Sequence, residues 1–153
     1  MTIQSYTETD AQEALAVFQS AVQESCYPDY SHRQIQAWCD VNQKVFFAKL
    51  ARQKTFLFVL KQQIVGLISA EQSGYLDLLF VKKAFQNQGI ASQLLSKIED
   101  WLIEQKIEIL TVESSLTAKS FFEQKGFQLI SKQQVELRNE QFINFKMSKQ
   151  IAK

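Results

Sequence analysis

The chain has 153 residues, a formal net charge of +1 and 46% hydrophobic residues, twelve of them phenylalanine. This length suits a single domain over residues 1–153, and the hydrophobic content can build a sizeable core, which excludes a disordered protein. The balanced charge gives no reason to expect nucleic acid or a membrane surface as a partner.

Two cysteines, Cys26 and Cys39, fit no metal-ligand spacing and are too few for a disulfide framework. We therefore expect no metal site and two reduced thiols. The first ten residues lack the charged and apolar regions of a signal peptide, and no apolar run is long enough to cross a bilayer. These features predict a soluble, cytoplasmic protein.

The chain opens with the alternating segment TIQSYT, which predicts a short edge strand. A helix is expected next, because apolar residues recur at helical spacing after Asp10 and because Thr9 and Gln12 form a capping-box pattern. The only proline, Pro28, marks a loop.

A second capping-box pattern, Ser31 with Gln34, predicts another helix, and the stretch VFFAKL predicts a third. The periodicity then changes. The segments TFLFVL, IVGLISAE and YLDLLFV are separated by the turn-sized KQQ and QSG, which predicts an antiparallel meander of three strands.

The long amphipathic stretch QGIASQLLSKIEDWLIEQK predicts a helix and is followed by the buried strand IEILTVE. A further helix, LTAKSFFEQK, closes at Gly126, and two strands end the chain. This order predicts an α/β or α+β domain with a mixed sheet, in which YLDLLFV, the long helix and IEILTVE form a right-handed crossover.

Gly89 lies between a predicted strand and the first turn of the long helix. The N–H groups of a first helical turn are unpaired, and the helix dipole adds positive potential there, so such a place binds phosphates. A glycine lets a pyrophosphate approach the backbone, Ala91 keeps the next position small, and Gln86 and Gln88 offer side-chain donors. The loop has neither the Walker nor the dinucleotide spacing, and by itself it is equally compatible with a flexible hinge.

Two motifs together resemble the signatures of the GNAT (Gcn5-related) N-acetyltransferase superfamily. Gln86-Asn87-Gln88-Gly89-Ile90-Ala91 is similar to the Gln/Arg-x-x-Gly-x-Gly/Ala motif of that family. The segment 118–127, AKSFFEQKGF, is similar to its second signature, a helix with an aromatic pair. The resemblance covers essentially the whole chain. It implies a mixed central sheet of about seven strands, four or five flanking helices, and a V-shaped splay between strands 4 and 5.

The resemblance also implies acetyl-CoA as the co-substrate. Its pyrophosphate would lie on the backbone amides around Gly89, and its pantetheine arm would pair with the end of the strand YLDLLFV. Ser115 stands where the family often has an asparagine. The residues implied to contact the cofactor are Leu79, Phe80, Val81, Gln86, Gln88, Gly89, Ile90, Ala91, Ser92, Ser115 and Phe122.

The implied reaction is direct transfer of acetyl from the thioester to an amine, with a general base that takes the ammonium proton. Tyr75 aligns with a position where some members carry a catalytic glutamate, so the expected base is Asp77, with Glu71 and Glu113 as alternatives. Strand alternation predicts one shared face for four residues: Tyr75, Asp77, Leu79 and Val81.

The sequence does not assign a general acid, because Phe122 stands where many members of the family have a tyrosine. Tyr75 or water would serve instead, or the thiolate leaves without help. Phe122 and Tyr75 therefore also fit an alternative, a catalytically weak acetyl-CoA-binding sensor or interaction protein. A structural domain without a ligand is the third interpretation, and it would make both motifs coincidences.

The acceptor is implied to be an amine of a small molecule or peptide, and aminoglycosides, polyamines, amino acids and protein amines all remain open. Trp38 could shape the acceptor pocket, but core packing is the favoured interpretation. A homodimer through the last strand, QFINFKM, follows from analogy with the family. The residues expected at the acceptor are Tyr27, Tyr30, His32 and Glu71.

Overall fold

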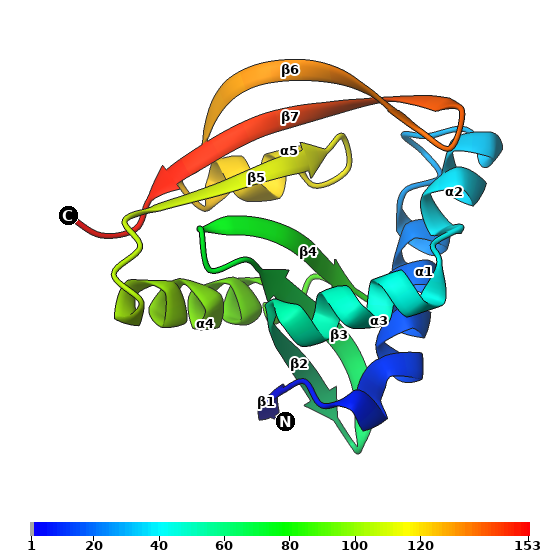
Figure 1. Ribbon diagram of the computed structural model, residues 1–153. Helices are drawn as coiled ribbons and strands as arrows, with labels where there is room; N and C mark the ends of the chain where they lie inside the picture. Colours follow the sequence, from blue (N-terminus) through cyan, green and yellow to red (C-terminus); the bar gives the residue numbers. More distant parts are fainter. Residues whose placement is uncertain (1) are drawn as a thin grey trace.

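The computed structural model describes residues 2–153 as a seven-stranded sheet with helices on both faces (Figure 1). The strand order is β1-β2-β3-β4-β5-β7-β6. The strands are β1 Thr2–Ser5, β2 Lys54–Leu60, β3 Gln63–Ala70, β4 Tyr75–Val81, β5 Ile109–Ser115, β6 Gln128–Leu137 and β7 Glu140–Gln150. The helices are α1 Ala11–Ser25, α2 His32–Cys39, α3 Gln43–Arg52, α4 Ile90–Glu104 and α5 Lys119–Gln124. Two short 3-10 helices, η1 and η2, cover Glu8–Asp10 and Lys83–Phe85.

The sheet is mixed, and its parallel pair, β4 with β5, decides where a site can form. Strands β1 to β4 pair antiparallel, as do β5, β7 and β6. Within the described chain, β4 and β5 pair in parallel only at Tyr75 with Thr111 and at Leu76 with Val112. Beyond these pairs the two strands diverge, as Figure 1 shows between the green β4 and the yellow-green β5. The predicted meander and the predicted splay are both confirmed.

Each face of the sheet has its own core. Helix α4 packs on one face through a stripe of buried residues at helical spacing, among them Leu94, Leu95 and Ile98. Helices α1, α2 and α3 cover the other face, where Phe18 and Phe46 stack with ring centroids 5.2 Å apart. The amphipathic periodicity of the sequence therefore placed the helices correctly.

The start of α1 differs from the predicted capping box. The box joins Thr7 and Asp10 instead of Thr9 and Gln12: the Thr7 amide donates to Asp10 Oδ2 at 2.9 Å. Because the Asp10 carboxylate reaches back to Thr7, the chain makes a 3-10 turn first and α1 begins at Ala11. The second predicted box is confirmed, since Ser31 Oγ accepts from the backbone amide three residues later at 3.1 Å.

Strand β4 contains a β-bulge, which corrects the expected alternation. Ala70 pairs with Leu76 but Ser69 pairs with Leu78, so Asp77 is an extra residue in the ladder. Asp77 contacts α3 and the loop after it, on the face where Leu78 is also buried. Leu79 and Val81 pack instead into the core that contains α4, so the four residues predicted to share a face do not.

The last strand is not an edge of the sheet. β7 lies between β5 and β6, so the segment QFINFKM has strand partners on both sides and its backbone cannot pair with a strand of a second copy. The outer edge is β6, where Leu129 and Ile130 are exposed. No helix in residues 2–153 is long and apolar enough to span a membrane.

Both cysteines are free and buried. Burial, together with the nearby Cys26, raises the pKa of Cys39 from an ordinary value of 9.0 to about 11. An unfolded chain therefore loses this proton near pH 9, while the folded chain keeps it until near pH 11. The stability that depends on the neutral thiol is complete below pH 9 and is lost as the pH rises towards 11.

We expect urea unfolding at pH 8, 9, 10 and 11 under reducing conditions to show this loss. The free energy of unfolding of the wild type should fall more steeply between pH 9 and 11 than that of Cys39→Ala, because alanine has no proton to lose. Parallel pH profiles for the two proteins would show that the pKa of Cys39 is not raised in the folded chain.

Candidate active site

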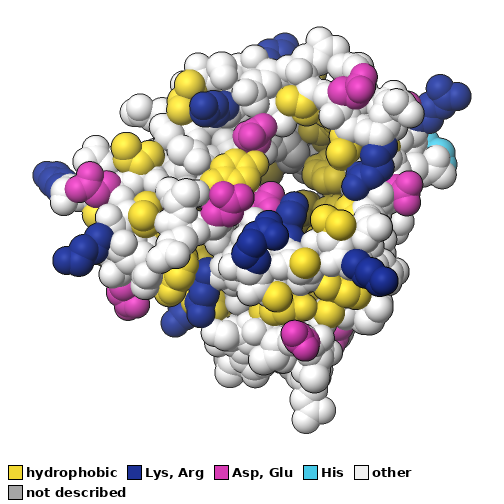
Figure 2. All heavy atoms as spheres, viewed as in Figure 1, with side chains coloured by type: hydrophobic (Ala, Val, Ile, Leu, Met, Phe, Trp, Pro, Cys, Tyr) yellow, Lys and Arg dark blue, Asp and Glu magenta, His cyan; other side chains and the backbone are white. Residues whose placement is uncertain are grey.

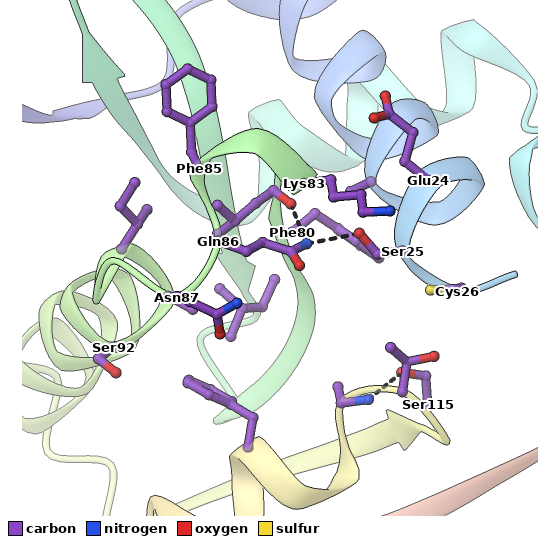
Figure 3. A pocket seen from close by; sticks show the side chains of 18 of the residues that line it. Glu24, Ser25, Cys26, Phe80, Lys83, Phe85, Gln86, Asn87, Ser92 and Ser115 are labelled. Carbon is purple, nitrogen blue, oxygen red and sulfur yellow. Dashed lines mark hydrogen bonds between the residues drawn. The ribbon is translucent and has the colours of Figure 1, made fainter. Parts of the chain in front are cut away.

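A cavity of about 570 Å³ opens where β4 and β5 diverge. Figure 3 looks into it between the end of α1, the loop from β4 to α4, and the start of α5. Of the residues expected at the cofactor, Gln88 alone does not line this cavity, and its side chain is exposed. Those that line it are Leu79, Phe80, Val81, Gln86, Gly89, Ile90, Ala91, Ser92, Ser115 and Phe122.

Gly89 forms the N-cap of α4 in the left-handed conformation, with φ of 82°. A Cβ built on it would meet no atom within 4 Å, so the space beside its backbone is open. In the part of the chain that the structure describes, the amides of residues 90–92 donate to no acceptor. These unpaired N–H groups and the dipole of a 15-residue helix make a lining suited to an anion.

Gln86 holds the wall of the cavity together. Its Nε2 donates to Ser25 Oγ and to the carbonyl oxygen of Val81, both at 2.9 Å (Figure 3). Both N–H bonds of the side-chain amide are thereby used, and the end of α1 is joined to the β4–α4 loop. The structure thus gives Gln86 a bracing role, and its contact with the cofactor stays a prediction.

Sequence reasoning missed several residues of this cavity. Lys83 is the one cationic side chain that lines it among residues 2–153, and its Nζ lies 5.6 Å from the ring centroid of Tyr27. Tyr27 was expected at the acceptor, yet it lies here and is 60% exposed. The Lys82-Lys83 pair before the glycine loop could have indicated a cation at this site. Only the fold shows which of the two lysines lines the cavity.

Five residues line both this cavity and a smaller neighbouring one. They form the boundary between the two cavities, which we call the neck, and one of them, Phe122, is only 3% exposed. Ser115 Oγ accepts from the Ala118 amide at 3.1 Å, which caps the turn into α5. The neck residues are Leu79, Phe80, Ser115, Ala118 and Phe122.

The smaller cavity has a volume of about 320 Å³. Its lining comes from α1, α2, α3, β4, β5, α5 and the β6–β7 hairpin, and it is mostly aromatic and aliphatic. Figure 2 shows a hollow between the upper and lower parts of the molecule, with yellow side chains in it and charged ones at its edge. The charged residues that line the cavity are Lys49, Asp77, Glu113 and Arg138.

Asp77 is the half-buried carboxylate of this cavity. Its Oδ2 accepts from Gln53 Nε2 at 2.9 Å and lies 3.1 Å from Lys49 Nζ. Gln53 Oε1 in turn accepts from the buried Ser69 hydroxyl at 2.7 Å, which fixes the orientation of the amide. Neither contact uses Oδ1, so one oxygen of the carboxylate is left for another partner.

Tyr75 lines neither cavity, although it was expected in catalysis. Its hydroxyl lies 3.5 Å from Glu113 Oε1, and Glu113 itself lines the smaller cavity. Burial, with the neighbouring carboxylates of Glu113, Asp77 and Glu71, raises the pKa of Tyr75. The phenol therefore keeps its proton at neutral pH, and its hydroxyl donates to the Glu113 carboxylate.

The residues expected at the acceptor are not brought together. Tyr30 lines the smaller cavity, and its hydroxyl accepts from the Leu116 amide at 2.8 Å, so it ties the α1–α2 loop to the end of β5. His32, the single histidine, is exposed at the start of α2 and lines neither cavity; Figure 2 shows it in cyan at the margin of the molecule. Glu71 is exposed in the β3–β4 turn, also outside both cavities.

Comparison with known proteins agrees with this geometry. Residues 26–149 match a family model described as an acetyltransferase (GNAT) domain. The uncharacterized N-acetyltransferase YafP of Escherichia coli K12 is 39% identical over 145 residues, which cover 95% of this chain and 93% of that protein. The chain belongs to the GNAT family. It is therefore an acyltransferase by membership.

Solved structures show the same GNAT fold. A GCN5-related N-acetyltransferase from Rhodopseudomonas palustris superposes with a TM-score of 0.95 at 26% identity, covering 97% of this chain and 94% of that one. PaiA N-acetyltransferase from Thermoplasma acidophilum, in complex with coenzyme A, gives a TM-score of 0.81 at 16% identity, with 98% and 99% covered. YncA from Salmonella typhimurium, with acetyl-CoA, gives 0.73 at 17% identity, with 100% and 95% covered.

Proposed function

We propose that this GNAT protein transfers acetyl from acetyl-CoA directly to an amine of a small molecule or peptide within a ternary complex. The observation that carries the proposal is the pair of neighbouring cavities that share the neck residues at the divergence of β4 and β5. One cavity suits a long phosphorylated cofactor, and the other suits a small acceptor. The thioester would lie in the neck, within reach of both.

The larger cavity supports acetyl-CoA as the co-substrate. The unpaired amides of residues 90–92 and the open space at Gly89 suit the pyrophosphate. The edge of β4 at residues 79–81 faces the side from which β5 has departed, so pantetheine amides can pair with it as a neighbouring strand would. Two relatives of this fold are described with coenzyme A or acetyl-CoA, which agrees with this assignment.

In the proposed reaction the amine nitrogen attacks the thioester carbonyl, a C–N bond forms, and the C–S bond then breaks. Backbone N–H groups near residues 79–81 would stabilise the tetrahedral oxyanion. Asp77 would take the ammonium proton, directly or through water, with its free Oδ1. CoA leaves as a thiolate. Phe122 has no proton to give, and Tyr75 lies outside the cavities, so we assign no protein acid to this step.

A second function, an acetyl-CoA-binding sensor without turnover, is favoured by one observation. Phe122 places a ring without a hydroxyl in the neck. Turnover of acetyl-CoA with any amine separates the two functions.

For the compartment we propose the cytoplasm, since the two thiols, Cys26 and Cys39, are unpaired.

A calorimetric titration of the protein with acetyl-CoA tests the proposal, with adenosine as the control ligand. We expect saturation at one cofactor per chain, because each chain carries one larger cavity of this kind in residues 2–153. Adenosine lacks the pyrophosphate and the pantetheine arm, so it should bind far more weakly. Absence of binding at millimolar acetyl-CoA would refute the cofactor site, and the proposed transfer with it.

A further inference from the structure

The smaller cavity has an aromatic wall, of which the sequence suggested Tyr30 and Trp38 but not Phe80 or Phe142. Trp38 lines this cavity together with Phe80 and Phe142. Its ring lies edge-on to both, with centroids 6.3 Å from Phe80 and 6.2 Å from Phe142. Tyr30 packs on the same indole at 5.4 Å. Such edge-to-face contacts hold the rings in fixed positions, so the wall is a rigid apolar surface.

The charges of the cavity are few, and they balance. Its lining has two carboxylates and two cations among the described residues. Asp77 is paired with Lys49 at 3.1 Å, and Arg138 Nη1 donates to the Ala37 carbonyl at 2.6 Å. Glu113 interacts only with neutral side chains, those of Tyr75 and Gln133. The cavity therefore has no surplus of negative charge with which to hold several ammonium groups.

We propose that the acceptor is a primary monoamine with an apolar, ring-bearing body. This inference rests on the proposed acetyl transfer. The body would lie against Trp38, Phe80 and Phe142, and the amine would point into the neck beside Phe122. An apolar surrounding disfavours the charged ammonium, so it also helps the amine to lose the proton that prevents attack. The proton leaves to Asp77 or water as the C–N bond forms and the CoA thiolate departs.

The same features exclude three of the acceptor classes that the sequence left open, namely polyamines, aminoglycosides and protein amines. A polyamine or an aminoglycoside would bring several ammonium groups into a space whose formal charges sum to zero and where only Glu113 lacks a cationic partner, and burying an unpaired charge is costly. A peptide would need partners for its own backbone N–H and C=O groups. The wall around Trp38 presents ring faces and edges instead, and 320 Å³ is at the small end of ligand cavities.

The wild-type protein tests this with a panel of amines at saturating acetyl-CoA, followed by thiol release and by mass spectrometry of the product. The probes are 2-phenylethylamine, spermidine, kanamycin and a short peptide with a free N-terminus. We expect kcat/KM for 2-phenylethylamine to exceed that for each of the others at least about 100-fold. A preference for spermidine, kanamycin or the peptide would overturn the inference, as would the absence of any acetylated product.

A calorimetric titration with acetyl-CoA on the same sample separates this inference from the proposed function. Binding of acetyl-CoA together with acetylation of spermidine would leave the proposed function in place and overturn only the acceptor class. Failure to bind acetyl-CoA would remove both.

The chain offers a matched pair of variants, because it has two tryptophans. Trp38→Leu shortens the aromatic wall, whereas Trp101→Leu changes a half-buried indole on α4 that lines neither cavity. We expect Trp38→Leu to raise KM for 2-phenylethylamine about tenfold without changing acetyl-CoA affinity, and Trp101→Leu to leave both unchanged. Equal kinetics in the two variants would contradict the proposed wall. If Trp38→Leu does not fold, the wild-type panel still decides the acceptor class.

Discussion

Gly89→Val is expected to weaken acetyl-CoA binding at least about 100-fold while the protein remains folded. The new Cβ and its two methyl groups would occupy the open space beside the backbone, where the pyrophosphate is proposed to lie. A hundredfold loss corresponds to about 2.7 kcal/mol of binding free energy. Calorimetry with acetyl-CoA measures the loss, and thermal unfolding reports the state of the fold.

Valine also strains this position, because Gly89 has φ of 82° and a side chain in that conformation costs roughly 1–2 kcal/mol. Gly126→Val is the matched control. Gly126 has φ of 94°, lines neither cavity, and would place its Cβ 3.6 Å from the flexible end of Lys149. We expect both variants to lose similar stability but only Gly89→Val to lose cofactor affinity. Wild-type affinity in Gly89→Val would refute the proposed pyrophosphate site.

The sequence predicted those parts of the fold that depend on neighbours along the chain. The Ser31–Gln34 capping box joins residues three apart, and the three-stranded meander follows from alternating segments with short turns. The glycine loop was located in the same way, because a strand, a glycine and a helix occur in succession. The family resemblance supplied what local patterns cannot, namely the divergence of β4 from β5.

What the sequence could not predict depends on contacts between distant residues. The bulge at Asp77 follows from the register of β4 against β3, and no local pattern records it. Gln86 meets Ser25 across 61 residues of sequence, so its bracing role becomes visible only in the fold. Trp38 packs against the core, as favoured, but the fold also makes it a wall of the smaller cavity, between which roles the sequence could not decide. The ion pair between Lys49 and Asp77 could not be predicted either, because the two residues lie in different elements.

The bulge places the Asp77 carboxylate against Gln53 and Lys49, and the assignment of Asp77 as the general base depends on these contacts. Gln53 donates to its Oδ2, and Ser69 fixes Gln53 from a fully buried position. Asparagine at position 77 can still accept from Gln53 through its one oxygen, so the fold should be conserved. The ion pair with Lys49 would be lost, but this lysine is 33% exposed, and a partly exposed pair contributes at most about 1 kcal/mol.

Asp77→Asn is therefore expected to lower kcat about 100-fold or more, which is the contribution of a positioned general base, and to leave acetyl-CoA affinity unchanged. Activity should appear at higher pH than in the wild type, because the amine must then lose its proton to water. The measurements are the pH profile of kcat and a calorimetric titration. Lys49→Met removes the ion pair but keeps the carboxylate, so it should retain most of the activity. If Asp77→Asn has wild-type kinetics, the general base is water or Glu113 instead of Asp77. If the base is Glu113, Glu113→Gln should show the lower kcat.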